Sequence, residues 1–235
     1  LPILAWFQNL DHGELNDLTP VVSSEHAMVF KKDGEYTNDS LEISKLGDGT
    51  KEVPYKISNA EELQKLIVSI GMMKKSNFYV LQTVDIDMKD AEIVPIGTCT
   101  KAFEGHYDGG GHVIKNMNML NYQGESMGLF NNISGVVERL GIESSTFKAD
   151  DNITRVGAFA GKLIGKGQLR NCYVIGSTMD FNSAPEIAVG ALVGEMLDSS
   201  HIEGCYGFKN TVVGRNDGRK KLRSEERRVG KECRS

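Results

Sequence analysis

The sequence predicts an all-β fold, a parallel β-solenoid of the right-handed β-helix kind with one N-terminal capping α-helix. Two observations lead to this fold class: a repeat of 33 residues in the second half of the chain, and short apolar segments separated by Gly-, Asn- or Ser-bearing turns. Such segments are too short for helices and too regularly punctuated for irregular loops. A third observation, a capping box followed by an apolar helical face, places one helix ahead of the repeats.

The repeat is clearest where Val156–Gly161 aligns with Val189–Gly194 at an offset of 33 residues. The same offset, without a gap, relates Cys172–Tyr173 to Cys205–Tyr206. One unit cannot bury its own apolar side, so stacked copies are needed to form a continuous core. Strands of successive coils would then pair in parallel, about 4.8 Å apart. A β-sandwich is the competing all-β fold, but a sandwich has no reason to repeat at this period.

Two looser copies of the unit precede these two. One runs from Met127–Phe130 to Val137–Ile142, and the other, looser still, from Phe103–Gly105 to His112–Met117. The chain therefore carries about four related units. The repeat positions that we expect to be structural are Gly128, Phe130, Gly157, Phe159, Gly161, Cys172, Gly190, Leu192, Gly194 and Cys205.

The first half of the chain contains the predicted cap. Ser58–Glu61 is a capping box, and apolar residues between Leu63 and Ile70 share one helical face, which predicts a helix near residues 59–70. This helix would cover the open β edge and apolar core of the first coil. The predicted segments are 1–10 (the end of a preceding module), 11–50 (a linker or small subdomain), 51–214 (the solenoid with its helix) and 215–235 (a non-native or disordered tail).

Charge and composition exclude several classes of protein. The formal net charge of −5 argues against a nucleic-acid binder, which needs a concentrated basic face. No stretch approaches the roughly 18 uninterrupted apolar residues of a membrane-spanning helix. The segment Arg223–Ser235 resembles the translation of a short-read sequencing adapter, and we exclude it from arguments about fold and function.

An ordered set of motifs runs through the chain. Its members are Asp48–Ser58, Asp85–Met88, Pro95–Gly97, Phe103–Met117 and Gly128–Phe130, then the closing glycines Gly161 and Gly194 and the trailing segment Asn171–Tyr173. In this order they resemble the GLUG-motif repeat module of bacterial secreted and surface proteins of the Bacteroidetes type, over roughly residues 47–214. One departure is Gly204, which replaces the Asn expected before Cys205, so we expect an Asn ladder along this turn to be broken.

The resemblance implies a function as well as a fold. Such modules also accompany the protease domain of immunoglobulin A peptidases. The resemblance implies a non-catalytic extracellular or cell-surface module for adhesion, ligand binding or display, with a host or matrix glycan or protein as its ligand. It also implies stacking on neighbouring modules of the same parent chain. We expect no catalytic residue, cofactor or metal. Two alternatives stay open: a fragment of a β-helical polysaccharide lyase or hydrolase, and a passive structural stalk.

Tyr173 and Tyr206 are the candidate ligand-contact residues. They occupy the same place in successive units, so they either pack together within the solenoid or form an exposed aromatic strip for contact with a sugar or a protein. Packing in the core or at a corner is the preferred interpretation. Cys172 and Cys205 also occupy equivalent places, within disulfide reach if the coils stack directly. The preferred interpretation is a buried pair of reduced thiols rather than a disulfide, and the redox state of the two cysteines stays open.

Two groups of polar residues suggest other chemistry. His106, Asp108 and His112 surround the glycines of Gly109–Gly111. A tight turn in which the glycines supply positive φ and the aspartate bonds to nearby backbone is preferred to a metal site, because zinc usually needs three or four converging ligands.

Asp85 and Asp87 would share one face of a strand, about 7 Å apart. Carboxylates at this spacing are able to hold calcium or to act as acid and base. The preferred interpretation is ordinary strand alternation, with Ile86 and Met88 inward and the two aspartates in water.

Overall fold

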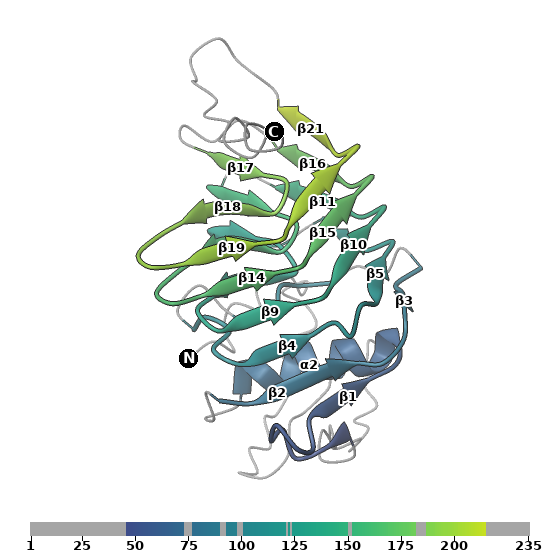
Figure 1. Ribbon diagram of the computed structural model, residues 1–235. Helices are drawn as coiled ribbons and strands as arrows, with labels where there is room; N and C mark the ends of the chain where they lie inside the picture. Colours follow the sequence, from purple (N-terminus) through teal and green to yellow (C-terminus); the bar gives the residue numbers. More distant parts are fainter. Residues whose placement is uncertain are drawn as a thin grey trace, which may run out of the picture. The chain divides into compact units, whose positions relative to one another are not determined.

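The computed structural model describes residues 46–72, 77–89, 93–97, 101–120, 122, 124–149, 152–181 and 187–214. These residues form a parallel β-solenoid with one helix near its N-terminal end (Figure 1), which confirms the predicted fold class. The chain divides into two units, Leu1–Glu42 and Ile43–Ser235, and every described residue belongs to the second. The predicted segments 1–10 and 215–235, and most of 11–50, lie outside the described residues.

The elements follow one another as successive coils. The entry region contains β1 (Tyr55–Ile57), α2 (Ala60–Met72), β2 (Tyr79–Gln82) and β3 (Ile86–Asp87). The first coil contains β4 (His106–Asp108), β5 (Val113–Lys115) and β6 (Asn118–Met119). The second contains β7 (Ser126–Met127), β8 (Phe130–Ile133), β9 (Val136–Glu138), β10 (Gly141–Glu143) and β11 (Thr146–Ala149). The third contains β12 (Arg155–Gly157), β13 (Ala160–Leu163), β14 (Gln168–Arg170), β15 (Tyr173–Ile175) and β16 (Thr178–Phe181). The fourth contains β17 (Ala188–Gly190), β18 (Val193–Met196), β19 (His201–Glu203), β20 (Tyr206–Phe208) and β21 (Thr211–Gly214).

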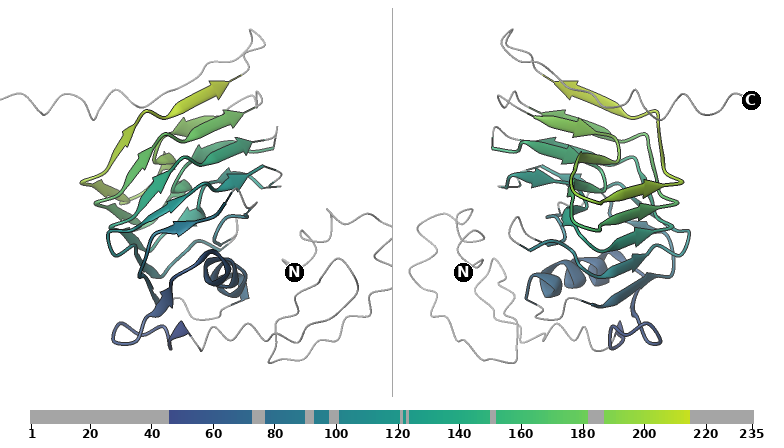
Figure 2. Two further views of the ribbon diagram at one scale, coloured as in Figure 1. Left: turned by 90° about the vertical axis from the view of Figure 1, so that its right-hand side faces the viewer. Right: turned by 60° about the vertical axis from the view of Figure 1, so that its left-hand side comes forward.

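Strands at the same place in successive coils pair in parallel and build five sheets along the stack (Figure 2). The sheets are β1-β2-β4-β9-β14-β19, β3-β5-β10-β15-β20, β6-β11-β16-β21, β7-β12-β17 and β8-β13-β18. Val156 pairs with Val189 and Tyr173 with Tyr206, which confirms the offset of 33 residues between the third and fourth coils.

The core consists of columns of apolar side chains, one from each coil. In the first sheet Val80, Tyr107, Val137 and Leu169 are consecutive register partners, and all four are buried. Parallel columns run through the next sheets, with Ile114, Ile142 and Val174 in one and Met119, Phe147 and Met179 in another. Each coil therefore buries its apolar side chains against the coils above and below it, as expected for a solenoid.

The helix is capped one residue later than the sequence pattern predicts. Asn59 Oδ1 accepts the N–H of Glu62 at 2.9 Å, and Glu62 Oε2 accepts the N–H of Ser58 at 2.7 Å. Asn59 and Glu62 thus satisfy the N-terminal donors in place of the predicted Ser58 and Glu61. Leu63 and Leu66 are fully buried in the core cluster, and α2 lies across the N-terminal end of the stack, beside β1 and β2 (Figures 1 and 2).

Side chains form a hydrogen-bonded ladder along one corner of the stack. Ser145 Oγ accepts the N–H of Met117 at 3.2 Å, and Ser177 Oγ accepts the N–H of Ser145 at 3.2 Å. Asn210 Oδ1 continues the ladder by accepting the N–H of Ser177 at 3.0 Å. Since these backbone donors turn away from the strand pairing at the corner, the side chains supply the partners that buried N–H groups require.

The neighbouring corner uses residues with positive φ. Asn171 and Gly204 adopt φ values of 50° and 63° at equivalent places. Gly204 has no side chain, so no Asn ladder continues from Asn171 at this turn, and the next residue supplies a contact between the coils: Cys205 Sγ accepts the N–H of Cys172 at 3.3 Å. Glycine adopts this backbone conformation without strain, so it replaces Asn here at no structural cost.

The closing glycines of the repeat allow two sheets to meet. A Cβ added to Gly161 would collide with the Cβ of Ser126 and lie 2.8 Å from the N atom of Met127. A Cβ on Gly194 would lie 2.7 Å from the N atom of Val156, one coil further along. Strand β13 therefore lies too close to β7, and β18 too close to β12, for a side chain at this position.

Replacement of Gly161 by Ala is expected to lower the free energy of unfolding by about 1–3 kcal/mol, because overpacking at a backbone contact displaces neighbouring strands. Gly207→Ala is the milder control, since the two atoms nearest to its Cβ would be side-chain atoms, at 3.0 and 3.1 Å, and the nearest backbone atom would lie at 4.0 Å. Urea unfolding followed by circular dichroism measures both changes. Equal stability of the Gly161→Ala variant and the unmodified chain would contradict the close-contact role.

Candidate functional site

The outer face of the sheet β3-β5-β10-β15-β20 carries the two candidate tyrosines. Tyr173 and Tyr206 are register partners, with ring centroids 5.5 Å apart and planes within 12° of each other. Val174, the next residue after Tyr173, is fully buried, so strand alternation directs Tyr173 outward. Tyr206 is 52% exposed. Packing in the core or at a corner, the interpretation preferred from the sequence, is therefore wrong for Tyr206, because the inward position of β20 is that of Gly207, the register partner of the buried Val174.

The ring of Tyr173 is held in one orientation. It reaches across to the preceding coil, where its Cζ occupies the place that a Cβ of Gly141 would take. Its hydroxyl donates a hydrogen bond to Glu143 Oε1 at 3.1 Å. Burial and then this carboxylate raise the pKa of Tyr173 to about 12. A glycine and a glutamate of one coil thus fix an aromatic ring of the next.

A third aromatic side chain extends this surface. Phe208 is 55% exposed and stands two residues after Tyr206 in β20, so the two share one face of the strand. Lys209 Nζ lies 5.3 Å from the centroid of the Phe208 ring. We call Tyr173, Tyr206 and Phe208 the aromatic strip. Phe208 was not among the residues predicted from the sequence, although its place 33 residues after Ile175 and its spacing of two residues from Tyr206 are both signals in the sequence.

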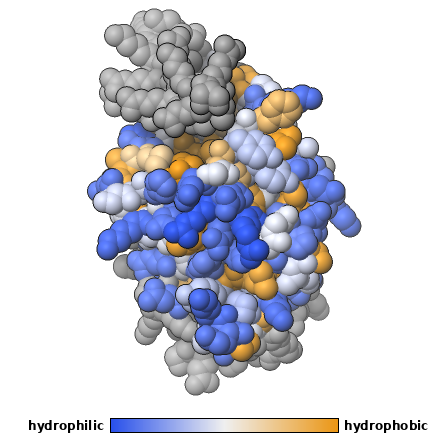
Figure 3. Space-filling view, in the orientation of Figure 1, coloured by the Kyte–Doolittle hydropathy of each residue, from blue (hydrophilic) through white to orange (hydrophobic). Residues whose placement is uncertain are grey.

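The neighbouring sheet, β4-β9-β14-β19, presents a charged face. Hydrophilic residues gather over β9 and β14, whereas hydrophobic and weakly polar ones gather toward the edge over β20 and β21 (Figure 3). His106 Nε2 lies 2.8 Å from Glu138 Oε1, and the His106 ring lies against that of Tyr79. Arg139 forms an ion pair with Asp108. Each pair joins the first coil to the second.

The histidines and aspartate of the predicted turn do not converge on a common centre. Asp108 Oδ1 accepts the N–H of Gly110 at 2.9 Å, as predicted for a turn. Of the three glycines only Gly110 and Gly111 adopt positive φ, so the prediction of positive φ for Gly109 is wrong. His112 points to a different partner, Asp85, with 3.2 Å between Nδ1 and Oδ1. In the described residues no group of three His, Cys, Asp or Glu side chains is placed to hold a metal ion.

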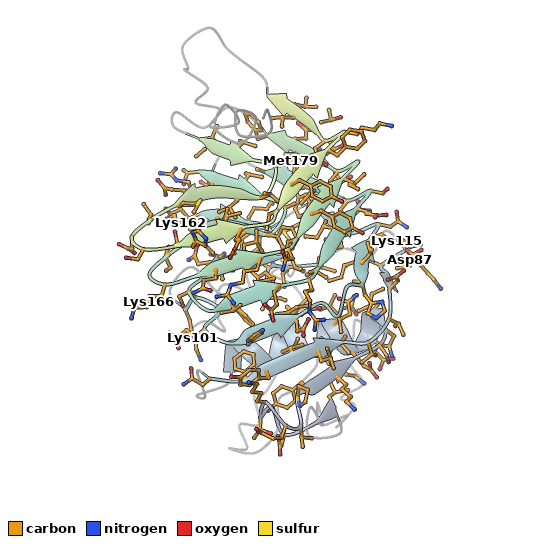
Figure 4. The ribbon with its side chains drawn as sticks, in the orientation of Figure 1. Asp87, Lys101, Lys115, Lys162, Lys166 and Met179 are labelled. Carbon is orange, nitrogen blue, oxygen red and sulfur yellow. The ribbon has the colours of Figure 1, made fainter. Side chains whose placement is uncertain are left out.

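The two aspartates near β3 bind neighbouring groups. Asp85 Oδ1 also accepts the N–H of Val113 at 3.1 Å. Asp87 accepts a hydrogen bond from Asn116 Nδ2 at 2.9 Å and lies 3.6 Å from Lys115 Nζ (Figure 4). These contacts lower the pKa of Asp87, chiefly through the hydrogen bond from Asn116. The partners come from the first coil, so both carboxylates fasten the entry region to it.

Cys172 and Cys205 are both free thiols that lie one above the other at the corner before the aromatic strip. Cys172 is buried, and Cys205 is half-buried. The hydrogen bond between the two thiols raises the pKa of Cys172 and lowers the pKa of Cys205. Cys205 is therefore the more acidic and the more accessible thiol of the two.

The other repeat positions lie inside the stack. Phe130 and Phe159 are fully buried, and Leu192 packs against the core from a partly buried position. Backbone atoms of neighbouring strands crowd the glycines at Gly128, Gly157, Gly161, Gly190 and Gly194. These positions support the fold.

Comparison with known proteins finds distant similarity. No family model matches the chain. It is 30% identical over 162 residues to a halomucin of Haloquadratum walsbyi, which is 63% of this chain and 2% of the halomucin. It is 31% identical over 125 residues to a protein of Evansella cellulosilytica provisionally described as a Gly-rich membrane protein, which is 51% of this chain and 14% of that protein. The chain thus spans a small part of each of these curated relatives.

One solved structure is also similar. It comes from Bacteroides ovatus, is provisionally described as an immunoglobulin A1 protease, and is 16% identical with a TM-score of 0.37, over 72% of this chain and 85% of that chain. A TM-score this low carries no argument about function. The GLUG-motif assignment therefore stays a prediction. In the part of the chain that the structure describes, no helix is long and apolar enough to cross a membrane.

Thiol labelling tests the arrangement of the cysteine pair. With Cys99 and Cys233 replaced by Ser, we expect one thiol, Cys205, to react in the folded chain and the second, Cys172, only after denaturation. The reason is the burial of Cys172 and the opposite pKa shifts of the two groups. Mass spectrometry after alkylation identifies the labelled residue. Equal rates, or no label even in denaturant, would contradict this arrangement.

Alkaline titration tests the environment of Tyr173. The folded chain holds this proton to a pH of about 12, whereas the unfolded chain releases it near 10.0, so the raised pKa contributes stability that is lost as the pH rises between these values. The Tyr173→Phe variant should lose less stability than the unmodified chain over this range. Urea unfolding at several pH values between 10 and 12 measures the free energy of unfolding of both proteins. The same dependence of this free energy on pH in both proteins would refute the prediction.

Proposed function

We propose that this chain is a non-catalytic repeat module of a secreted or cell-surface protein and that it binds glycans through the aromatic strip. The similarity to a halomucin and to a protein described as a membrane protein supports the setting. The matches cover 2% and 14% of those proteins, which supports a role as one part of a much longer chain. Adhesion or display at a surface suits such a part.

The observation that carries the proposal is the pair of Tyr173 and Tyr206 rings on the outer face of a sheet. Aromatic rings pack against the apolar C–H faces of pyranose sugars, and Tyr hydroxyls supply hydrogen bonds at the same place. The rings stand on paired strands, and Glu143 holds one of them through its hydroxyl, so little conformational freedom is lost on binding. Glu143 also offers carboxylate oxygens to sugar hydroxyls.

The arrangement supports binding better than catalysis. The carboxylates that the sequence singled out, Asp85 and Asp87, each accept hydrogen bonds from neighbouring coils. A lyase or hydrolase would need acidic groups free to exchange protons with a substrate. A passive stalk would bind no ligand on the aromatic strip. Absence of binding is therefore the result that would favour the stalk over a binding module.

The test is an array of glycans and mucins probed with the chain and its variants. We expect saturable binding to one glycan class, and about two- to tenfold weaker binding for Tyr206→Ala, since an aromatic contact contributes about 0.5–1.5 kcal/mol. Tyr206→Phe should keep most of the affinity because the ring remains. Tyr79→Ala is the matched control: this half-buried tyrosine lies on another sheet, against His106.

Absence of binding by a folded chain would overturn the proposal in favour of the passive stalk. An equal loss on Tyr79→Ala would contradict the assignment to the aromatic strip. Circular dichroism of each variant separates loss of the surface from loss of the fold.

A further inference from the structure

The cysteines of the third and fourth coils occupy the same place at one corner of the stack. The register pairs on both sides of them, Arg170 with Glu203 and Tyr173 with Tyr206, keep the offset of 33 residues through this corner. Partners in neighbouring parallel strands lie about 4.8 Å apart. This separation falls inside the range of about 4.4–6.8 Å between Cα atoms that a disulfide joins. The backbone therefore has the spacing that a disulfide requires.

The two thiol side chains have matching orientations. Cys172 Sγ lies 3.1 Å from the carbonyl O of Arg170, and Cys205 Sγ lies 3.2 Å from that of Glu203, in each case two residues earlier in the chain. Cys205 Sγ also reaches the third coil, where it accepts the N–H of Cys172 at 3.3 Å, and the two thiols are hydrogen-bonded to each other. The two sulfur atoms are therefore neighbours in the folded chain before any bond joins them.

The second coil offers no third sulfur at this corner. Gly141 is the register partner of Tyr173, so Leu140 stands in the second coil where Cys172 stands in the third. Leu140 is buried. In the part of the chain that the structure describes, Cys172 and Cys205 are the only cysteines, and both are free thiols. A bond at this corner thus links the third coil to the fourth and to no other.

We propose that Cys172 and Cys205 are an oxidation site, at which exchange with a small disulfide such as glutathione disulfide joins the fourth coil to the third beside the aromatic strip. In the first step the Cys205 thiolate attacks one sulfur of the small disulfide and releases one thiol, which leaves a mixed disulfide on Cys205. The sulfur of Cys172 then attacks Cys205 Sγ and releases the second thiol. The two cysteines lose two electrons and two protons, and the small disulfide gains both.

The environments of the two thiols set the order of these steps. The hydrogen bond between them lowers the pKa of Cys205, which favours the thiolate that attacks the small disulfide. The same hydrogen bond, together with burial, raises the pKa of Cys172, which keeps this thiol protonated until the mixed disulfide has formed. Cys172 is therefore the group that completes the bond.

The bond would act on the candidate binding surface. Cys172 and Cys205 directly precede Tyr173 and Tyr206, so a disulfide would fix the backbone from which both rings project. The secreted or cell-surface setting proposed above supplies the oxidising conditions in which such bonds persist. The bond itself depends only on the contact between the two thiols, and it is tested without a glycan. Failure of glycan binding and failure of this inference are thus separate results.

Mass spectrometry of the full chain, equilibrated in mixtures of reduced and oxidised glutathione, tests the site. Cleavage after glutamate separates the two cysteines, because three glutamates, the last of them Glu203, lie between them. We expect a pair of peptides joined through Cys172 and Cys205, present even where reduced glutathione is in excess. The absence of this pair at every ratio, or a preferred bond of either cysteine to Cys99 or Cys233, would overturn the proposal.

Urea unfolding of the oxidised and reduced forms of the unmodified chain measures what the bond does. Oxidation should raise the midpoint by about 1 M, because a closed loop of 33 residues restricts the unfolded chain. Amides of β20 should also exchange with solvent more slowly after oxidation, whereas those of β4 should not change. An unchanged midpoint with unchanged exchange in β20 would overturn the role of the bond in fastening the two coils.

Cys172→Ser and Cys205→Ser are the matched controls, since each replaces one sulfur by an oxygen and leaves the rest of the corner in place. Oxidation should leave the midpoint of either variant unchanged. An equal rise in the variants and in the unmodified chain would overturn the assignment to this pair, because other cysteines would then account for the effect.

Discussion

The pairing of each coil with the one before it is the interaction on which the rest of this structure depends. Backbone pairing joins consecutive coils in all five sheets, and side-chain contacts repeat the same step. Lys162 Nζ lies 2.8 Å from Glu125, and Arg155 lies 2.7 Å from Glu195. Each of these ion pairs links one coil to the next, as do the columns of apolar side chains. Stability is therefore a sum of nearest-neighbour contacts, as in other repeat proteins.

The same stacking builds the candidate binding surface. A residue that faces outward in one coil acquires a neighbour from the next at the same place, so the tyrosines of the third and fourth coils, Tyr173 and Tyr206, stand ring against ring. The absence of a side chain at Gly141 lets the Tyr173 ring lie against the sheet. A surface of this kind is held by the sheet beneath it, which suits the glycan binding proposed above.

The two ends of the stack follow from the same rule and differ because of one helix. A coil has two apolar faces, and each requires a partner. Helix α2 supplies that partner at the start, through Leu63 and Leu66, whereas the described residues of the fourth coil leave Met196 and Val212 exposed. The helix therefore accounts for the difference between the two ends of the described stack.

Periodicity in the sequence by itself determined the fold class, the register of Val156 with Val189 and of Tyr173 with Tyr206, and the position of the helix, because regular spacing is a local property. It could not choose between overlapping caps at Ser58 and Asn59, which fit the same pattern. Tertiary structure alone decided that His106 meets Glu138 and that Arg139 meets Asp108, since the first two coils are offset by 30 residues in this sheet and not 33. It also decided that Tyr206 faces water, because the direction of a side chain depends on which neighbour in the strand fills the interior.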